Sequence, residues 1–209
     1  MVVAAVLTRS LAAMAMFGAL AFVPLFVQAV TGASATRSGA VLVPFVLGWV
    51  ALSATSARLV LRVGYRSVVM AGVACLTGAF LLLARWDAGL GMVGAMRDVL
   101  LAGVGMGLVI VPMLIAVQSA VPRSDLGIAT SVIQFFMSIG AAVGVSVMGT
   151  VMAQRLAAGR PLVDALHGVF VTGLVVCVGA LVASLLVPAG RAQDLARAEM
   201  RGEPTRVGG

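Results

Sequence analysis

The sequence predicts an all-α integral membrane protein with six transmembrane helices. Of its 209 residues, 62% are hydrophobic and 10% are charged, whereas about a quarter of the residues in soluble domains are charged. A membrane-spanning helix needs about 20 apolar residues, and six such runs follow one another along the chain. The runs lack the polar–apolar alternation of membrane β-strands, so helices are expected to satisfy the backbone hydrogen bonds in lipid.

The predicted spans cover residues 11–30, 39–57, 68–84, 99–117, 128–153 and 169–187. Residues 1–10 precede them and residues 188–209 form a polar tail. Arg9, three arginines between residues 58 and 66, Arg123 and four in the tail would share one side of the membrane, against five arginines on the other. By the positive-inside rule, we expect both termini in the cytoplasm. The position of the arginines on the cytoplasmic side thereby explains the net positive charge of the chain, and no nucleic-acid partner is expected.

The first run resembles a signal peptide, because Arg9 precedes it and Ala33-Ser34-Ala35 imitates a cleavage site. It is longer than the usual apolar region of a signal peptide, and five further spans follow. We therefore interpret it as a retained helix.

A weak internal repeat links the two halves of the chain. Pro24 precedes Gly39 by fifteen positions, and Pro112 precedes Gly127 by the same fifteen. The repeat divides the chain into two units of three helices, and an odd number of helices inverts one unit relative to the other in the membrane. Secondary transporters use this arrangement, although coincidence between two apolar stretches is the alternative.

No catalytic, cofactor or metal site is predicted. Residues 89–94 match the glycine spacing of dinucleotide sites, but they lack the preceding strand that this motif requires. Cys75 and Cys177 lie in separate apolar runs, and His167 is the single histidine, so neither a nucleophilic triad nor a set of metal ligands can be assembled. We expect a protein that is not an enzyme.

Small residues recur at one-turn spacing within two spans, at Gly103 and Gly107 and at Gly140 and Gly144. Such pairs let helix backbones approach closely. Helix packing is the favoured interpretation, and the same grooves could serve helix sliding or contact a ligand.

Ionisable side chains are absent from the middle of the predicted spans, where proton and ion relays are usually found. Asp98 lies at the edge of the fourth span beside Arg97, and we interpret it as a solvated helix terminus. The Phe and Met residues concentrate in the first, second and fifth spans, where they would face lipid, neighbouring helices or a cavity.

Several stretches match a known group of membrane proteins in their order and spacing. They are residues 22–39 (FVPLFVQAVTGASATRSG), Val43-Pro44, residues 58–66, residues 103–107 with Pro112, Val121-Pro122, residues 127–129 and residues 140–150. Together they resemble the C-terminal half of a major facilitator superfamily transporter, in the fourteen-span drug/proton antiporter branch. The resemblance extends over about residues 9–186 and implies half of that fold.

The resemblance also suggests a role for the basic segment of residues 58–66. Its frame of Arg58, Arg62, Gly64 and Arg66 is similar to the family's cytoplasmic loop, which helps to lock a gate. Leu61 stands where the family has an acid, so the alternatives are a gating loop and an anchor for anionic headgroups.

The resemblance implies efflux of small amphipathic molecules by alternating access, with the first and fourth helices forming a cavity wall. The expected ligand contacts are Phe17, Phe22, Gln28, Met106 and Gln118. A transporter needs a second, N-terminal half, supplied by the same gene, a separate chain or a homodimer. The absence of lysine and asparagine suggests a GC-rich bacterial genome and hence the bacterial plasma membrane. The alternative is a truncated remnant or a membrane interaction subunit that transports nothing.

Overall fold

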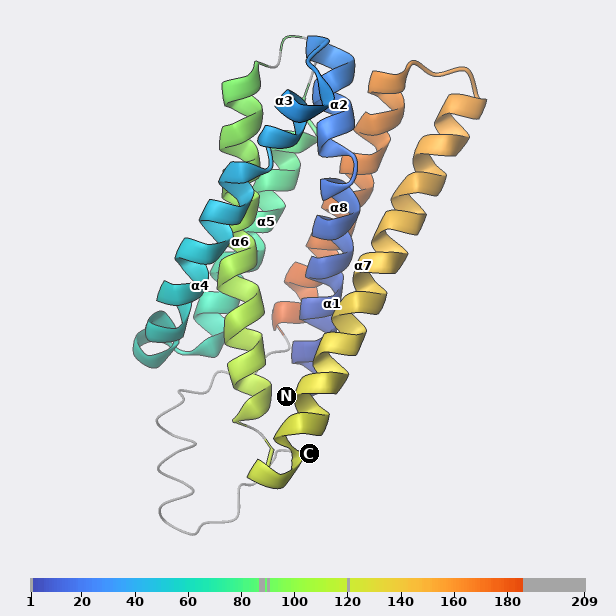
Figure 1. Ribbon diagram of the computed structural model, residues 1–209. Coiled ribbons are helices and arrows are strands. Elements are labelled where there is room, and N and C mark those ends of the chain that lie inside the picture. The colour runs from blue at the N-terminus through green and yellow to red at the C-terminus, as the bar shows by residue number, and fades with distance from the viewer. Residues whose placement is uncertain (1, 87–88, 90, 120, 186–209) are drawn as a thin grey trace.

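The computed structural model describes residues 2–86, 89, 91–119 and 121–185 as a bundle of long helices that run along a common axis (Figure 1). The described residues contain no strand. The predicted tail of residues 188–209 lies outside them. In chain order the helices are α1 (Val2–Leu20), α2 (Val23–Thr31), α3 (Ala35–Ala40), α4 (Val43–Val63), α5 (Tyr65–Leu83), α6 (Met92–Gln118), the 3-10 turn η1 (Arg123–Asp125), α7 (Leu126–Ala157) and α8 (Leu162–Leu185).

Within the described residues, six segments are long and apolar enough to cross a membrane, which confirms the predicted fold class. Four of them are α5, α6, η1 with α7, and α8. The other two are interrupted: α1 and α2 form one span, and α3 and α4 form the next. Each interruption comes just before a proline, Pro24 or Pro44, that lies in the first turn of the following segment. Proline fits there because it lacks the N–H that a helix interior requires.

The helices pack as two interleaved units of three spans each. The span α1–α2, α4 and α5 form the first unit, and α6, α7 and α8 form the second. Helices α4 and α5 of the first unit pack on α6 of the second unit. Helices α7 and α8 of the second unit pack on α1 of the first unit. The helices α5 and α8 also contact each other. Exchanging the two units reproduces this set of contacts, while α1 and α6 run in opposite directions (Figure 1). This is the arrangement of an inverted repeat.

The spans differ strongly in how much of their surface the bundle covers. In an apolar 18-residue stretch of each span, 67% of the residues of α6 and 56% of those of α1 and α2 are buried, whereas the share is 22% in the span of α4 and 17% in that of α7. The first and fourth spans therefore form the centre of the bundle. The second and fifth spans leave wide faces uncovered.

Gly103 and Gly107 allow α6 to approach α4. A Cβ atom on Gly103 would collide with the backbone carbonyl of Phe45, and one on Gly107 would lie 2.7 Å from the carbonyl oxygen of Trp49. Since a backbone carbonyl cannot rotate away as a side chain can, both positions require glycine for this contact.

Gly140 and Gly144 have the same relation to α1. A Cβ atom on Gly140 would meet the backbone of Ser10, and one on Gly144 would meet the backbone of Met14. The four glycines therefore lie at two helix contacts, α4 with α6 and α1 with α7. These two contacts occupy corresponding positions in the inverted repeat.

Candidate functional site

The five residues expected to contact a ligand do not gather at one place. Phe17 of α1 packs edge-on against Trp49 of α4, with 6.3 Å between the ring centres. Phe22 lies at the break between α1 and α2, half-buried. Gln28 lies on α2, near the end of the bundle where the turn at Gly32 is found.

Gln118 lies at the opposite end of the bundle from Gln28, at the end of α6. Its side-chain amide donates a hydrogen bond of 3.1 Å to the hydroxyl of Thr130 on α7. Met106 is fully enclosed in the hydrophobic core. Met106 therefore lies in the core of this bundle, because neighbouring helices pack on α6 from several sides.

The basic frame of residues 58–66 is mostly helical, which corrects its interpretation as an interhelical loop. Arg58 and Arg62 lie on exposed positions of α4, one turn apart, and Arg66 lies in the first turn of α5. The connection is Gly64 alone, with φ of +85°. Glycine adopts this conformation without the steric cost that a Cβ atom brings, so the two helices turn within one residue.

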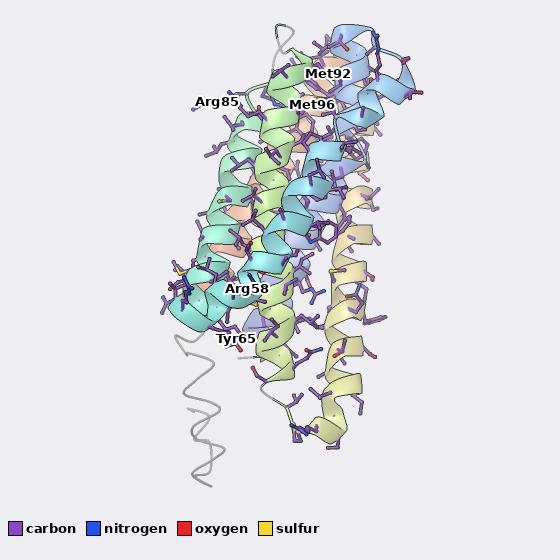
Figure 2. All side chains as sticks on the ribbon, turned by 60° about the vertical axis from the view of Figure 1, so that its left-hand side comes forward. Arg58, Tyr65, Arg85, Met92 and Met96 are labelled. Carbon is purple, nitrogen blue, oxygen red and sulfur yellow. The ribbon has the colours of Figure 1, made fainter. Side chains whose placement is uncertain are left out.

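Tyr65 was not singled out from the sequence, yet it ties this turn to the bundle. Its side chain is buried, and its hydroxyl lies 3.4 Å from the hydroxyl of Ser119 at the end of α6. Figure 2 shows Arg58 and Tyr65 at one end of the bundle and Arg85 at the other. The basic turn and the α6–α7 connection therefore share one end.

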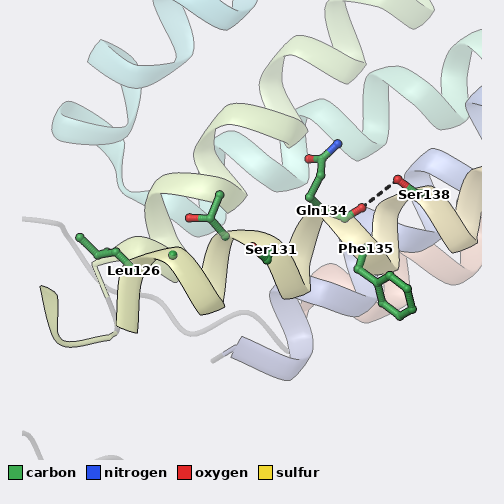
Figure 3. A pocket seen from close by; sticks show the side chains of 7 residues that line it. Leu126, Ser131, Gln134, Phe135 and Ser138 are labelled. Carbon is green, nitrogen blue, oxygen red and sulfur yellow. Dashed lines mark hydrogen bonds between the residues drawn. The ribbon is translucent and has the colours of Figure 1, made fainter. Parts of the chain in front are cut away.

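A polar stripe follows one face of α7 beside this end. The hydroxyls of Thr130, Ser131 and Ser138 and the amide of Gln134 line an open depression together with Leu126, Gly127 and Phe135 (Figure 3). Residues 130, 134 and 138 are spaced at one helical turn, so they share a face. Polar groups facing lipid are costly, so this stripe indicates contact with water, a ligand or other protein.

Arg9 lies buried beside this stripe, although its position near the start of the chain suggested a cytoplasmic end. It belongs to α1 and only 3% of its surface is exposed. Its Nη2 donates a hydrogen bond of 3.2 Å to Oε1 of Gln134, and its Nε lies 3.4 Å from Sδ of Met137. Sequence position could not reveal this burial, which follows from the close approach of α7 to α1.

Asp98 is also buried, which corrects its interpretation as a solvated helix terminus. It is 2% exposed, in the second turn of α6. Nε1 of Trp86 donates to its carboxylate at 2.9 Å, and the largely exposed Arg97 forms an ion pair with it at 2.8 Å. The Trp86 ring packs on Phe26 and Phe170. Trp86 therefore covers the carboxylate of Asp98 and shields it from water.

Comparison with characterised proteins places this bundle in a family. No protein-family model matches the chain. It is 36% identical over 151 residues to a multidrug transporter protein of Bacillus subtilis, and 35% identical over 152 residues to a tetracycline resistance determinant of Streptomyces rimosus. An MFS efflux transporter of Aspergillus oryzae is 34% identical over 142 residues. These alignments cover 72%, 72% and 68% of the chain.

The chain belongs to the major facilitator superfamily. The relatives and the six candidate spans together show a multi-pass membrane protein. The matched part of the chain spans 28% of the Bacillus protein, 43% of the Streptomyces protein and 26% of the Aspergillus protein. The matched part of the chain therefore corresponds to less than half the length of each of these relatives.

Proposed function

We propose that this chain forms the C-terminal half of a drug/proton antiporter of the fourteen-span branch and exports small amphipathic molecules by alternating access. It acts with an N-terminal half supplied by the same gene, a separate chain or a homodimer, in the bacterial plasma membrane with both termini cytoplasmic. Relatives named as multidrug and efflux transporters support the export of such compounds. The chain is not an enzyme in this proposal.

One observation carries the proposal that a second half completes the transporter. The spans of α4 and α7 are 22% and 17% buried, and the exposed face of α7 carries a row of hydroxyl and amide groups. A helix facing only lipid would present apolar side chains there. The row of polar groups fits a water-filled cavity between two halves better than it fits a lipid-facing surface. In such a cavity, polar groups orient an otherwise apolar ligand.

In this proposal Phe17, Phe22, Gln28 and Gln118 contact ligand during the transport cycle. Their half-buried positions leave part of each side chain accessible at the bundle surface. Gln28 and Gln118 lie toward opposite ends of the bundle, so they would act on the ligand in different states, one open to each side of the membrane.

The test uses the assembled transporter in a drug-sensitive bacterial host. We expect Gln28→Ala and Gln118→Ala to change the relative resistance to a panel of amphipathic drugs without lowering the amount of protein in the membrane. Gln154→Ala on the exposed far end of α7 is the matched control. Wild-type profiles in both test variants would exclude these residues from the ligand site, and no efflux with any partner half would favour a non-transporting remnant or interaction subunit.

A further inference from the structure

The buried Arg9 carries a positive charge that the described residues do not neutralise. Within the described part of the chain, the one ion pair joins Arg97 and Asp98. A buried charge is stable only when it is paired or fully hydrogen-bonded. The acceptors found for Arg9 are the amide oxygen of Gln134 and the thioether of Met137, and a thioether is a weak acceptor.

Three consecutive residues of α1 have a buried polar atom that lacks a hydrogen-bond partner among the described residues. Nη1 of Arg9 is buried without a hydrogen-bond partner among the described residues, and so are the hydroxyls of its neighbours Thr8 and Ser10. A guanidinium offers five N–H groups in a planar fork, and here only two of its nitrogens have a partner. An acceptor with two oxygen atoms and a negative charge matches what remains.

Gln134 links the buried guanidinium of Arg9 to the surface. Gln134 accepts from Arg9 and at the same time lines the open depression on α7, together with Thr130, Ser131 and Ser138 (Figure 3). Gln134 is exposed while Arg9 is 97% enclosed. A molecule in the depression therefore meets hydroxyl and amide groups first and lies one side chain away from the guanidinium.

We propose that Arg9 and Gln134 bind the carboxylate or phosphate group of an amphipathic anion whose apolar part lies along α7. Phe135 and Leu126, which line the same depression, provide apolar contact for that part. This inference deepens the proposed function, on which it rests, by naming acidic amphiphiles as a ligand class. A lipid headgroup offers the same phosphate chemistry, so the experiment must separate the two sources.

The experiment measures binding of two fluorescent probes to the purified 209-residue chain in phosphatidylcholine nanodiscs. The probes are dansylamino-undecanoic acid and its methyl ester, which differ by one negative charge. We expect wild type to bind the acid about tenfold or more tightly than the ester, since hydrogen bonds to a charged group are stronger than those to a neutral one. Arg9→Gln should remove this preference while leaving ester binding within about twofold.

Two further variants separate loss of charge from loss of folding. Arg9→Lys retains the charge and should keep most of the preference for the acid. Arg37→Gln removes an exposed arginine of α3 at the other end of the bundle and should leave the preference unchanged. Circular dichroism of each variant checks that the helices are retained.

The lipid arm replaces part of the phosphatidylcholine with phosphatidylglycerol. Retention of the acid preference supports a site for amphipathic ligands, whereas its loss identifies the headgroup phosphate as the occupant and overturns the proposal. Equal binding of acid and ester by wild type, or an unchanged preference in Arg9→Gln, also overturns it. Because these outcomes compare two probes in one preparation, they can fail while efflux by the assembled transporter remains intact.

Discussion

Replacing Gly144 by alanine tests how closely α1 and α7 are packed. The added Cβ atom would meet the carbonyl oxygen of Met14 and lie 2.9 Å from its Cα atom, whereas ordinary contact begins at 3.4 Å. The carbonyl oxygen is the closest of these atoms, so the helices must separate by roughly 1 Å or more, which forfeits about half of the dispersion energy of each contact across this seam. Overpacking of this kind costs about 1–3 kcal/mol.

The measurement is the free energy of unfolding in mixed micelles, followed by loss of helical circular dichroism as sodium dodecyl sulfate is added. We expect Gly144→Ala to lower it by about 1–3 kcal/mol. Gly179→Ala is the matched control, because this mid-helix glycine of α8 has no atom within 4 Å of its Cβ position. There alanine should be neutral or stabilise by up to about 1 kcal/mol through its higher helix propensity.

The reasoning would be refuted if Gly144→Ala kept the unfolding free energy of the wild type, as is expected of Gly179→Ala. That result would mean that α1 and α7 do not approach at the backbone distance described. A decrease for both variants by the same amount would point to a general effect of alanine on the micelle-bound state instead.

Three further outcomes are expected. Reporter fusions after Gly32 and after Gly64 should report opposite sides of the membrane, with Gly64 on the cytoplasmic side; two cytoplasmic readings would contradict the topology. Asp98→Ala should destabilise the chain by about 1–3 kcal/mol, because it leaves the buried indole N–H of Trp86 without its acceptor, and a red shift of tryptophan emission would report water entry. The purified chain in liposomes with a pH gradient should show no proton-coupled drug movement, since no described acid lies at mid-span; gradient-dependent uptake that is lost in Asp98→Asn or His167→Ala would overturn this.

The sequence by itself determined the six helical spans, because hydropathy and span length are local properties of consecutive residues. The breaks that divide the first two spans, next to Pro24 and Pro44, were seen only in the structure. The resemblance in residues 22–39 and 140–150 was also readable from the chain alone, since its motifs are short and contiguous.

Only the tertiary structure decided which polar residues are buried and which faces are left open. Arg9 and Asp98 lie just outside the predicted spans, where a sequence pattern predicts solvation, but α7 covers Arg9 and Trp86 covers Asp98. Met106 was indistinguishable in sequence from a cavity-lining methionine, and packing on several sides of α6 places it in the core. Burial depends on which helices pack together, and glycine spacing shows that a helix has a close neighbour without identifying that neighbour.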